Sequence, residues 1–182
     1  MSSAAESLRH SLIGAWRLVE YKVTPQNGGA PSYPMGKDAQ GIIMYTPDGY
    51  MSAQLMTPGA PKFSVPDLSG GTKDELAESM KRYLAYSGRY NVSTTEDGKP
   101  HLTHQMEVCS YPNWLGNVQQ RVVKLEGEYL QLGTDGPILV EVCCGNEFFL
   151  LLFKLDTDGI RAGRTSTSYS LVAENEAGLV CC

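Results

Sequence analysis

The sequence lacks both a long hydrophobic segment and an excess of positive charge. Its longest uninterrupted apolar run is Phe148–Phe153, far shorter than the roughly 20 residues of a membrane-spanning helix. The N-terminal residues MSSAAESLRHSLIGAW lack the basic and apolar regions of a secretion signal. The net charge of −5, from 15 basic and 20 acidic residues, disfavours nucleic acid and anionic membranes as partners. These absences predict a soluble, cytoplasmic protein that binds neither.

Motifs for cofactors and metals are also missing. The five cysteines are odd in number and have no Cys-x-x-Cys spacing, which indicates reduced thiols rather than zinc ligands. The sequence contains no Gly-x-Gly-x-x-Gly, no phosphate loop, no Gly-x-Ser-x-Gly elbow and no histidine-rich set. We therefore expect neither a cofactor nor a metal. The terminal Cys181-Cys182 pair lacks the Cys-a-a-X pattern of a prenylated end, so we expect a frayed tail over 173–182.

Two segments have the pattern of a helix. Ser3 and Glu6 are spaced as a capping box before the first, Ala4–Ile13. Thr72 and Glu75 have the same spacing at the start of the second. The apolar face of the second helix consists of Leu76, Met80 and Leu84.

The rest of the chain predicts about ten short strands separated by Gly- and Asp-rich turns. A length of 182 residues fits one domain, 1–182, with its strands over about 15–172. This pattern predicts an all-β antiparallel barrel or sandwich. The loop Thr57–Gly71 is either a mobile lid or a passive surface excursion. The expected strands are Ala15–Val23, Gln40–Tyr45, Tyr50–Met56, Ser87–Thr94, His101–Cys109, Val118–Leu125, Tyr129–Gly133, Ile138–Cys143, Glu147–Leu155 and Ile160–Val172.

Four segments, in order from Leu12 to Arg121, resemble the bacterial and fungal lipocalin-like domain family. They are LIGAWRLVEY, PMGKDAQGIIMYTPDGYMSAQL, YLAYSGRYNV and HQMEVCSYPNWLGNVQQR. The resemblance implies a closed antiparallel barrel of about 8–10 strands with an internal pocket for a small apolar or amphipathic molecule. It implies no single activity: related barrels carry ligands, and some catalyse cofactor-free cyclisation or isomerisation. In fungi, such domains are often encoded alongside polyketide or terpenoid pathways. Trp16 would plug the closed end, with Arg161 or Arg164 stacked on it.

Strand alternation predicts which side chains face the barrel interior. Three consecutive strands should each direct polar groups inward. The predicted inward residues on these strands are Tyr86 and Tyr90, then His104 and Met106, then Gln119, Arg121 and Val123. Tyr45 is a further candidate for the pocket wall. If the three strands pair in order, these polar groups lie within reach of one another.

For the expected strand Glu147–Leu155, the lysine indicates which face points inward. Lys154 should face solvent, which places Phe149 and Leu151 among the substrate-binding residues. The opposite face would then be an apolar outer stripe, which needs a cover. The second helix is the favoured cover and a homodimer is the alternative. The stripe would contain Phe148, Leu150 and Leu152.

An inward arginine requires an explanation, because an unpaired buried charge is destabilising by several kcal/mol or more. Arg121 either forms a structural salt bridge, with Glu20 or Glu141 as candidate partners, or faces a ligand. His104 is either a satisfied core histidine or a functional one.

These residues suggest three functions. In the first, a cofactor-independent isomerase, cyclase or dehydratase acts on a polyketide- or terpenoid-like metabolite. Its catalytic residues are Arg121, which holds a developing oxyanion, His104, which moves the proton, and Tyr90 (or Tyr86), which donates to a second oxygen. In the second, a carrier binds the same kind of small oxygenated hydrophobic molecule and needs only the Arg121 contact. In the third, a structural module pairs through its outer apolar stripe.

Overall fold

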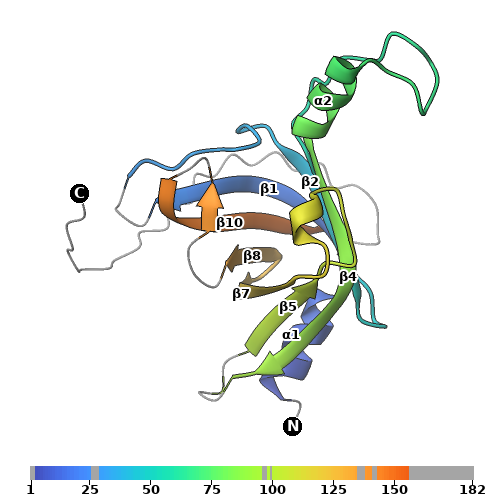
Figure 1. The fold of residues 1–182 in the computed structure, drawn as a ribbon. Coiled ribbons are helices and arrows are strands. Elements are labelled where there is room, and N and C mark those ends of the chain that lie inside the picture. The colour runs from blue at the N-terminus through green and yellow to red at the C-terminus, as the bar shows by residue number, and fades with distance from the viewer. Residues whose placement is uncertain are drawn as a thin grey trace.

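The computed structural model describes residues 3–25, 29–95, 98, 100–134, 138–140 and 143–155, of which 138–140 and 143–149 are described by backbone alone. The described chain is mostly β, as predicted (Figure 1). The helices are α1 (Ala4–Leu12) and α2 (Lys73–Lys81), with a 3-10 turn, η1 (Pro112–Trp114). The strands are β1 (Gly14–Pro25), β2 (Gln40–Tyr45), β3 (Tyr50–Met56), β4 (Tyr83–Thr94), β5 (Pro100–Gln105), β6 (Val108–Cys109), β7 (Val118–Glu126), β8 (Tyr129–Thr134), β9 (Ile138–Val140) and β10 (Cys143–Leu155).

Eight of these strands form a closed antiparallel barrel, which confirms the predicted fold class. The order is β1-β2-β3-β4-β5-β7-β8-β10, and β10 pairs back onto β1. The closing register runs from Ala15 opposite Leu155 to Pro25 opposite Asn146. Two short strands lie off this path, β6 on β4 and β9 on β10. The expected strand Ile160–Val172 lies outside the described residues.

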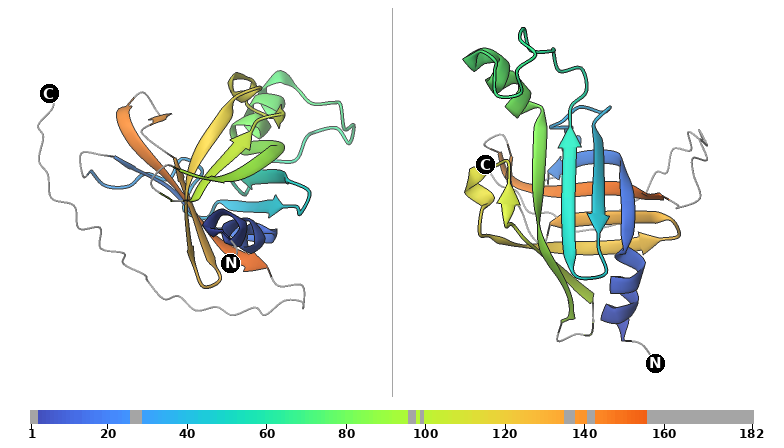
Figure 2. Two further views of the ribbon diagram at one scale, coloured as in Figure 1. Left: turned by 90° about the horizontal axis from the view of Figure 1, so that it is seen from below. Right: turned by 90° about the vertical axis from the view of Figure 1, so that its right-hand side faces the viewer.

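Helix α1 closes one end of the barrel (Figures 1 and 2). The predicted capping box between Ser3 and Glu6 is present. Leu12 is fully buried, and its carbonyl oxygen accepts a hydrogen bond of 2.8 Å from the indole Nε1 of Trp16. Trp16 itself is buried in the core. The N-terminal helix is therefore packed onto the barrel and is continuous with its hydrophobic core.

The ammonium of Lys154 lies 5.3 Å from the centre of the Trp16 ring and donates a 3.1 Å hydrogen bond to the carbonyl of Ser11. This cation occupies the place that sequence reasoning assigned to Arg161 or Arg164, which lie outside the described residues. Because Lys154 lies beside Trp16 at the barrel end, it does not mark the outer face of β10. The predicted alternation of that strand is consequently wrong: Leu150 and Leu152 belong to the buried core, and Leu151 does not.

Helix α2 does not cover the barrel, contrary to the prediction. It projects away from the strands (Figure 1), and none of its residues is buried. The side chains of Leu76 and Met80 are 49% and 47% exposed. The helix ends at Lys81, and Leu84 lies in β4, opposite Leu55 of β3. The third residue of the predicted apolar helix face therefore belongs to a strand. Only the other two lie on the helix itself.

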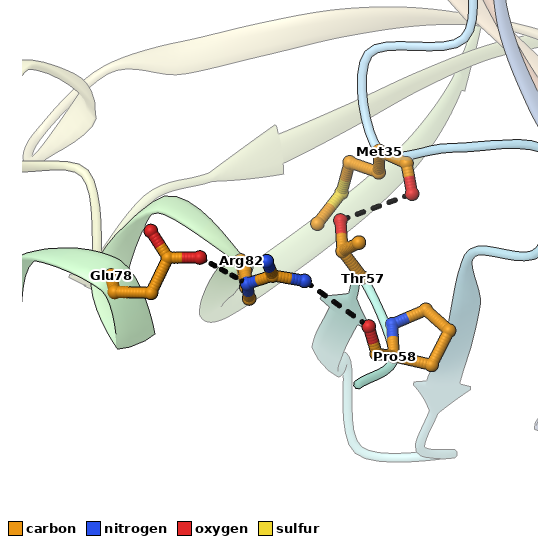
Figure 3. Close-up of polar contacts among 5 residues, drawn as sticks. All are labelled: Met35, Thr57, Pro58, Glu78 and Arg82. Carbon is orange, nitrogen blue, oxygen red and sulfur yellow. Dashed lines mark hydrogen bonds and ion pairs between the residues drawn. The ribbon is translucent and has the colours of Figure 1, made fainter. Parts of the chain in front are cut away.

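The loop 57–72 and helix α2 together form an arm, which we call the helical arm. Figure 3 shows how it is attached. Arg82 pairs with Glu78 at 2.6 Å and donates to the carbonyl of Pro58 at 3.3 Å. The hydroxyl of Thr57 donates to the carbonyl of Met35 at 3.0 Å, and the amide of Thr57 donates to the carbonyl of Arg82. Both ends of the arm are therefore held side by side at the ends of β3 and β4.

We expect the two helices to respond differently to the loss of a leucine. Leu12→Ala should lower the free energy of unfolding by about 2–5 kcal/mol, because it leaves a cavity in a packed core. Leu76→Ala should change it by less than about 0.5 kcal/mol, because the side chain is half exposed. Chemical denaturation of both variants measures this. Equal losses in the two variants would contradict the assignment of α1 to the core and α2 to solvent.

The attachment of the helical arm can be tested separately from the barrel. Arg82→Ala should speed amide hydrogen exchange in α2 while leaving exchange in β1 and β10 unchanged, because it removes contacts that only the arm uses. Lys81→Ala removes the same charge one residue away and serves as the control. Protection of α2 that is the same in both variants would show that Arg82 does not hold the arm.

Candidate functional site

The three strands predicted to direct polar groups inward do so. Tyr86 and Tyr90 of β4 are buried, and His104 of β5 is fully buried. Gln119 and Arg121 on β7 are partly buried, whereas the residues on either side of each are exposed. Tyr90 lies opposite His104, and His104 lies opposite Gln119. The alternation of residues along these strands therefore predicted correctly which side chains face this part of the interior.

His104 is the most unusual side chain in the interior. Its Nε2 forms a 3.0 Å hydrogen bond with the hydroxyl of Tyr45, a fully buried residue of β2. Its Nδ1 is buried and has no hydrogen-bond partner in the part of the chain that the structure describes. Burial, and next the positive charge of Arg121, lower the pKa of His104 to about 3. The imidazole is therefore neutral at physiological pH, with one ring nitrogen unused.

Aromatic rings surround this histidine. The Tyr45 and Tyr90 rings meet edge to face at 5.1 Å between centroids. The Tyr86 ring lies 6.4 Å from the His104 ring and 5.9 Å from that of Trp114, in η1. Burial raises the pKa of the Tyr45 and Tyr86 hydroxyls, so both stay protonated. The site presents flat apolar faces with neutral hydroxyl groups between them.

The hydroxyl of Tyr90 already has an acceptor. It donates to the carbonyl of Thr46 at 2.9 Å, and the guanidinium of Arg9 in α1 lies 5.1 Å from its ring centre. Tyr90 thus connects the barrel wall to the closed end. The role that sequence reasoning gave it, donation to a substrate oxygen, would require that bond to break.

Arg121 lies on the inward-facing side of β7. Its guanidinium donates to the side-chain oxygen of Gln119 and to the carbonyl of Gln120 at 3.1 Å, and its charge acts on the hydroxyl of Tyr86. Within the described residues, no carboxylate pairs with it. Glu20, one predicted partner, pairs instead with Lys22 at 2.7 Å. Glu141, the other, lies outside the described residues.

A β-bulge explains why Glu20 is not available to Arg121. The pairing of β1 with β10 shifts register between Leu18 and Glu20. Val19 and Glu20 therefore both lie outside the core, and Tyr21 faces the interior and is buried. Simple alternation from Trp16 would have placed Glu20 inside and Tyr21 outside. Tyr21 is therefore an interior residue that sequence reasoning missed.

Thr134 and Trp114 were also missed. Thr134, at the end of β8, lies opposite Arg121, and its buried hydroxyl oxygen has no hydrogen-bond partner among the described residues. Alternation along β8 from Leu130 and Leu132 would have identified it. Trp114 comes from the turn η1, where no strand pattern applies, so only the folded chain brings it to Tyr86.

The remaining predicted site residues have three different outcomes. Met106 is fully buried, and Val123 is packed partly buried against the core, as expected of wall residues. Leu151 lies on the opposite face of β10 from the prediction, because Lys154 is at the barrel end. The side chain of Phe149 is outside the described part of the structure.

An open groove of about 390 Å³ lies outside the barrel, on the face of β2, β3 and β4 shown in Figure 2. Its surface is mostly apolar, although Thr46 and Glu107 also line it and the hydroxyl of Ser87 donates to that of Ser52 there. Its walls include Met44, Tyr50, Ser52, Ser87, Gly88 and Val108. The convergent polar groups are inside the barrel, so the candidate site is the interior.

Residues 13–141 match the model of the lipocalin-like domain family. The chain belongs to this family. It is also similar to a 4'-hydroxy-3'-methoxypropiophenone carrier protein of Aspergillus oryzae, with 44% identity over 93 residues. That alignment covers 50% of this chain and 84% of the relative.

Two other features are missing from the described residues. No helix there has the length and apolar character needed to cross a bilayer. No group of three or more His, Cys, Asp and Glu side chains is placed to hold a metal ion in that part of the chain.

The buried neutral histidine predicts a specific acid sensitivity. In the unfolded chain His104 takes up a proton near its ordinary pKa of about 6.5, whereas in the folded protein it does so only near 3. Protonation therefore favours the unfolded state as the pH falls from about 6.5 to 3. Over that range the folded state should lose stability on the order of 4 kcal/mol from this residue.

His104→Gln removes this titration. The difference in unfolding free energy between wild type and variant should change over pH 6.5 to 3 and be constant above pH 7. His101→Gln, on the same strand, is the control and should show no such change. A pH-independent difference for His104→Gln would mean that His104 titrates normally in the folded protein.

Proposed function

We propose that this protein is a carrier that holds a small oxygenated aromatic molecule inside its barrel. The observation that supports this most is the unpartnered Nδ1 of His104, fully buried among aromatic rings. A buried polar atom without a partner destabilises the protein by about 1–3 kcal/mol. A ligand oxygen at this atom would remove that penalty.

Either tautomer of His104 suits a ligand oxygen. When the Tyr45 hydroxyl donates to Nε2, the proton of the ring is on Nδ1, which then donates to a carbonyl oxygen. When Nε2 carries the proton, Nδ1 accepts a hydrogen bond from a hydroxyl group. The Tyr45 hydroxyl satisfies Nε2 in both cases, so it positions the ring for the ligand.

The surrounding walls favour an aromatic ligand. Tyr86, Tyr45 and Trp114 present ring faces and edges, and Leu102 and Met106 add aliphatic surface next to His104. Apolar walls with a few convergent polar groups are typical of small-molecule sites. The Aspergillus oryzae relative is named for a ligand of this class, an aromatic ketone with a phenol and a methoxy group.

Carriage fits the electrostatics better than catalysis. A general base works best when its pKa is close to the operating pH. The pKa of His104, near 3, makes it a poor proton acceptor at neutral pH. A neutral imidazole and neutral phenols are, however, good hydrogen-bond partners for a ligand that is held and released unchanged. The similarity to a carrier protein supports the same choice over an isomerase, cyclase or dehydratase.

The proposal predicts binding of 4'-hydroxy-3'-methoxypropiophenone without conversion. Titration calorimetry should detect a one-to-one complex, and mass spectrometry should recover the compound unchanged. His104→Leu should weaken binding by about tenfold, because it removes one hydrogen bond at similar volume.

His101→Leu is the matched control, since His101 lies on the same strand and bonds the side chain of Gln120. It should leave the affinity unchanged. Circular dichroism of both variants separates lost binding from lost folding. Conversion of the compound by wild type, or equal affinity of wild type and a folded His104→Leu protein, would contradict the carrier proposal.

A further inference from the structure

The inward-facing side of β7 carries a cation, the half-buried Arg121. Arg121 reaches inward from β7 between Gln119 and Val123, and its contacts with Gln119, Gln120 and Tyr86 are all to neutral groups. Its charge affects side chains on four other strands, since it influences the titration of Tyr21, Tyr45, Tyr86 and His104. The guanidinium is therefore a positive charge that acts on several interior side chains.

Three described carboxylates on or next to the barrel strands pair with other cations. Glu126 pairs with Lys124 at 2.7 Å on the outer face of β7, and Glu107 pairs with Arg89. Glu20 pairs with Lys22. Opposite Arg121 stands the unpartnered hydroxyl of Thr134. A guanidinium and a free hydroxyl, side by side and inward, form a pair of donors with no described anion between them.

From this arrangement we infer that the barrel binds its ligand as an anion, an acidic phenol that loses its proton on entry and pairs with Arg121 and Thr134. This inference rests on the proposed carrier function and adds the ionisation state of the ligand. The released proton passes to solvent. A second oxygen of the ligand, such as a ketone, takes the Nδ1 position of His104.

The tyrosines around Arg121 do not themselves become the anion that pairs with it. Burial raises the pKa of the Tyr21, Tyr45 and Tyr86 hydroxyls, although Arg121 opposes that shift. A phenol with an acyl group para to the hydroxyl is more acidic, because the carbonyl delocalises the negative charge. Such a ligand ionises before the tyrosines do. The titratable groups on which Arg121 acts and which stay neutral are thus Tyr21 of β1, Tyr45 of β2, Tyr86 of β4 and His104 of β5. Cys109 of β6 lies opposite Tyr86.

The ligand's own absorption spectrum tests this inference. The phenolate of 4'-hydroxy-3'-methoxypropiophenone absorbs at longer wavelength than the phenol, so the bound form can be read directly. In the complex with wild type, the phenolate band should be present at least about one pH unit below the pH at which it develops for the free compound, which corresponds to at least tenfold preference for the anion. Binding should also release a proton, measured by calorimetry in buffers of different ionisation enthalpy.

Variants of β7 identify the cation. Arg121→Gln should abolish the shift and weaken binding by about tenfold or more, because a charge-assisted hydrogen bond is lost. Arg121→Lys should restore much of the shift. Lys124→Gln removes the same charge from the outer face of the same strand and should leave the bound spectrum as in wild type.

A methyl ether separates this inference from the carrier function. In 3',4'-dimethoxypropiophenone the hydroxyl cannot ionise, so wild type should bind it at least about tenfold more weakly than the phenol. Arg121→Gln should bind the two alike. If wild type binds the phenol but its spectrum stays that of the neutral form, the anion inference fails and the carrier proposal stands. If wild type binds neither compound, both fail.

Discussion

Antiparallel pairing of β1 with β10 closes the barrel, and the exclusion of water from its interior follows from that closure. In an open sheet, the inward face of β4, β5 and β7 would be hydrated, and a histidine there would keep a nearly ordinary pKa. In the closed barrel, His104 is fully buried and stays neutral far below neutral pH. The unpartnered Nδ1 and the raised pKa of the buried tyrosines have the same origin.

The closed end depends on contacts between the N-terminal helix and the last described strand. Trp16 of β1, the backbone of α1 and Lys154 of β10 form one set of hydrogen and cation–π contacts. These residues are far apart in sequence, and they meet only when β10 lies beside β1. Closure of the sheet and closure of the barrel end are therefore coupled.

The electrostatic character of the interior favours recognition of a ligand over acid–base chemistry. Hydroxyl groups and a neutral imidazole provide hydrogen bonds without exchanging protons near pH 7. Arg121 adds a positive charge that none of the described carboxylates neutralises. The proposed ligand, an oxygenated aromatic molecule, would satisfy both features, and it is of the same chemical class as the ligand for which the Aspergillus oryzae relative is named.

Local patterns in the sequence determined much of this protein. Period-two alternation correctly placed Tyr86, Tyr90, His104 and Arg121 inside, and both capping boxes form where the spacing indicates them. Such features depend on residues within a few positions of one another. Sequence reasoning failed where the outcome depends on a distant partner. The bulge in β1 brings in Tyr21, and Lys154 reverses the assignment of β10.

The tertiary structure decided which groups lack a partner. No pattern of residue types reveals that Nδ1 of His104 and the hydroxyl of Thr134 are buried without an acceptor or donor, because that depends on every neighbouring strand. The sequence by itself determined the strands, the barrel and most of its inward face. Closure of the barrel decided the protonation states and hydrogen bonds of the inward side chains, because all the strands together are needed to exclude water from them.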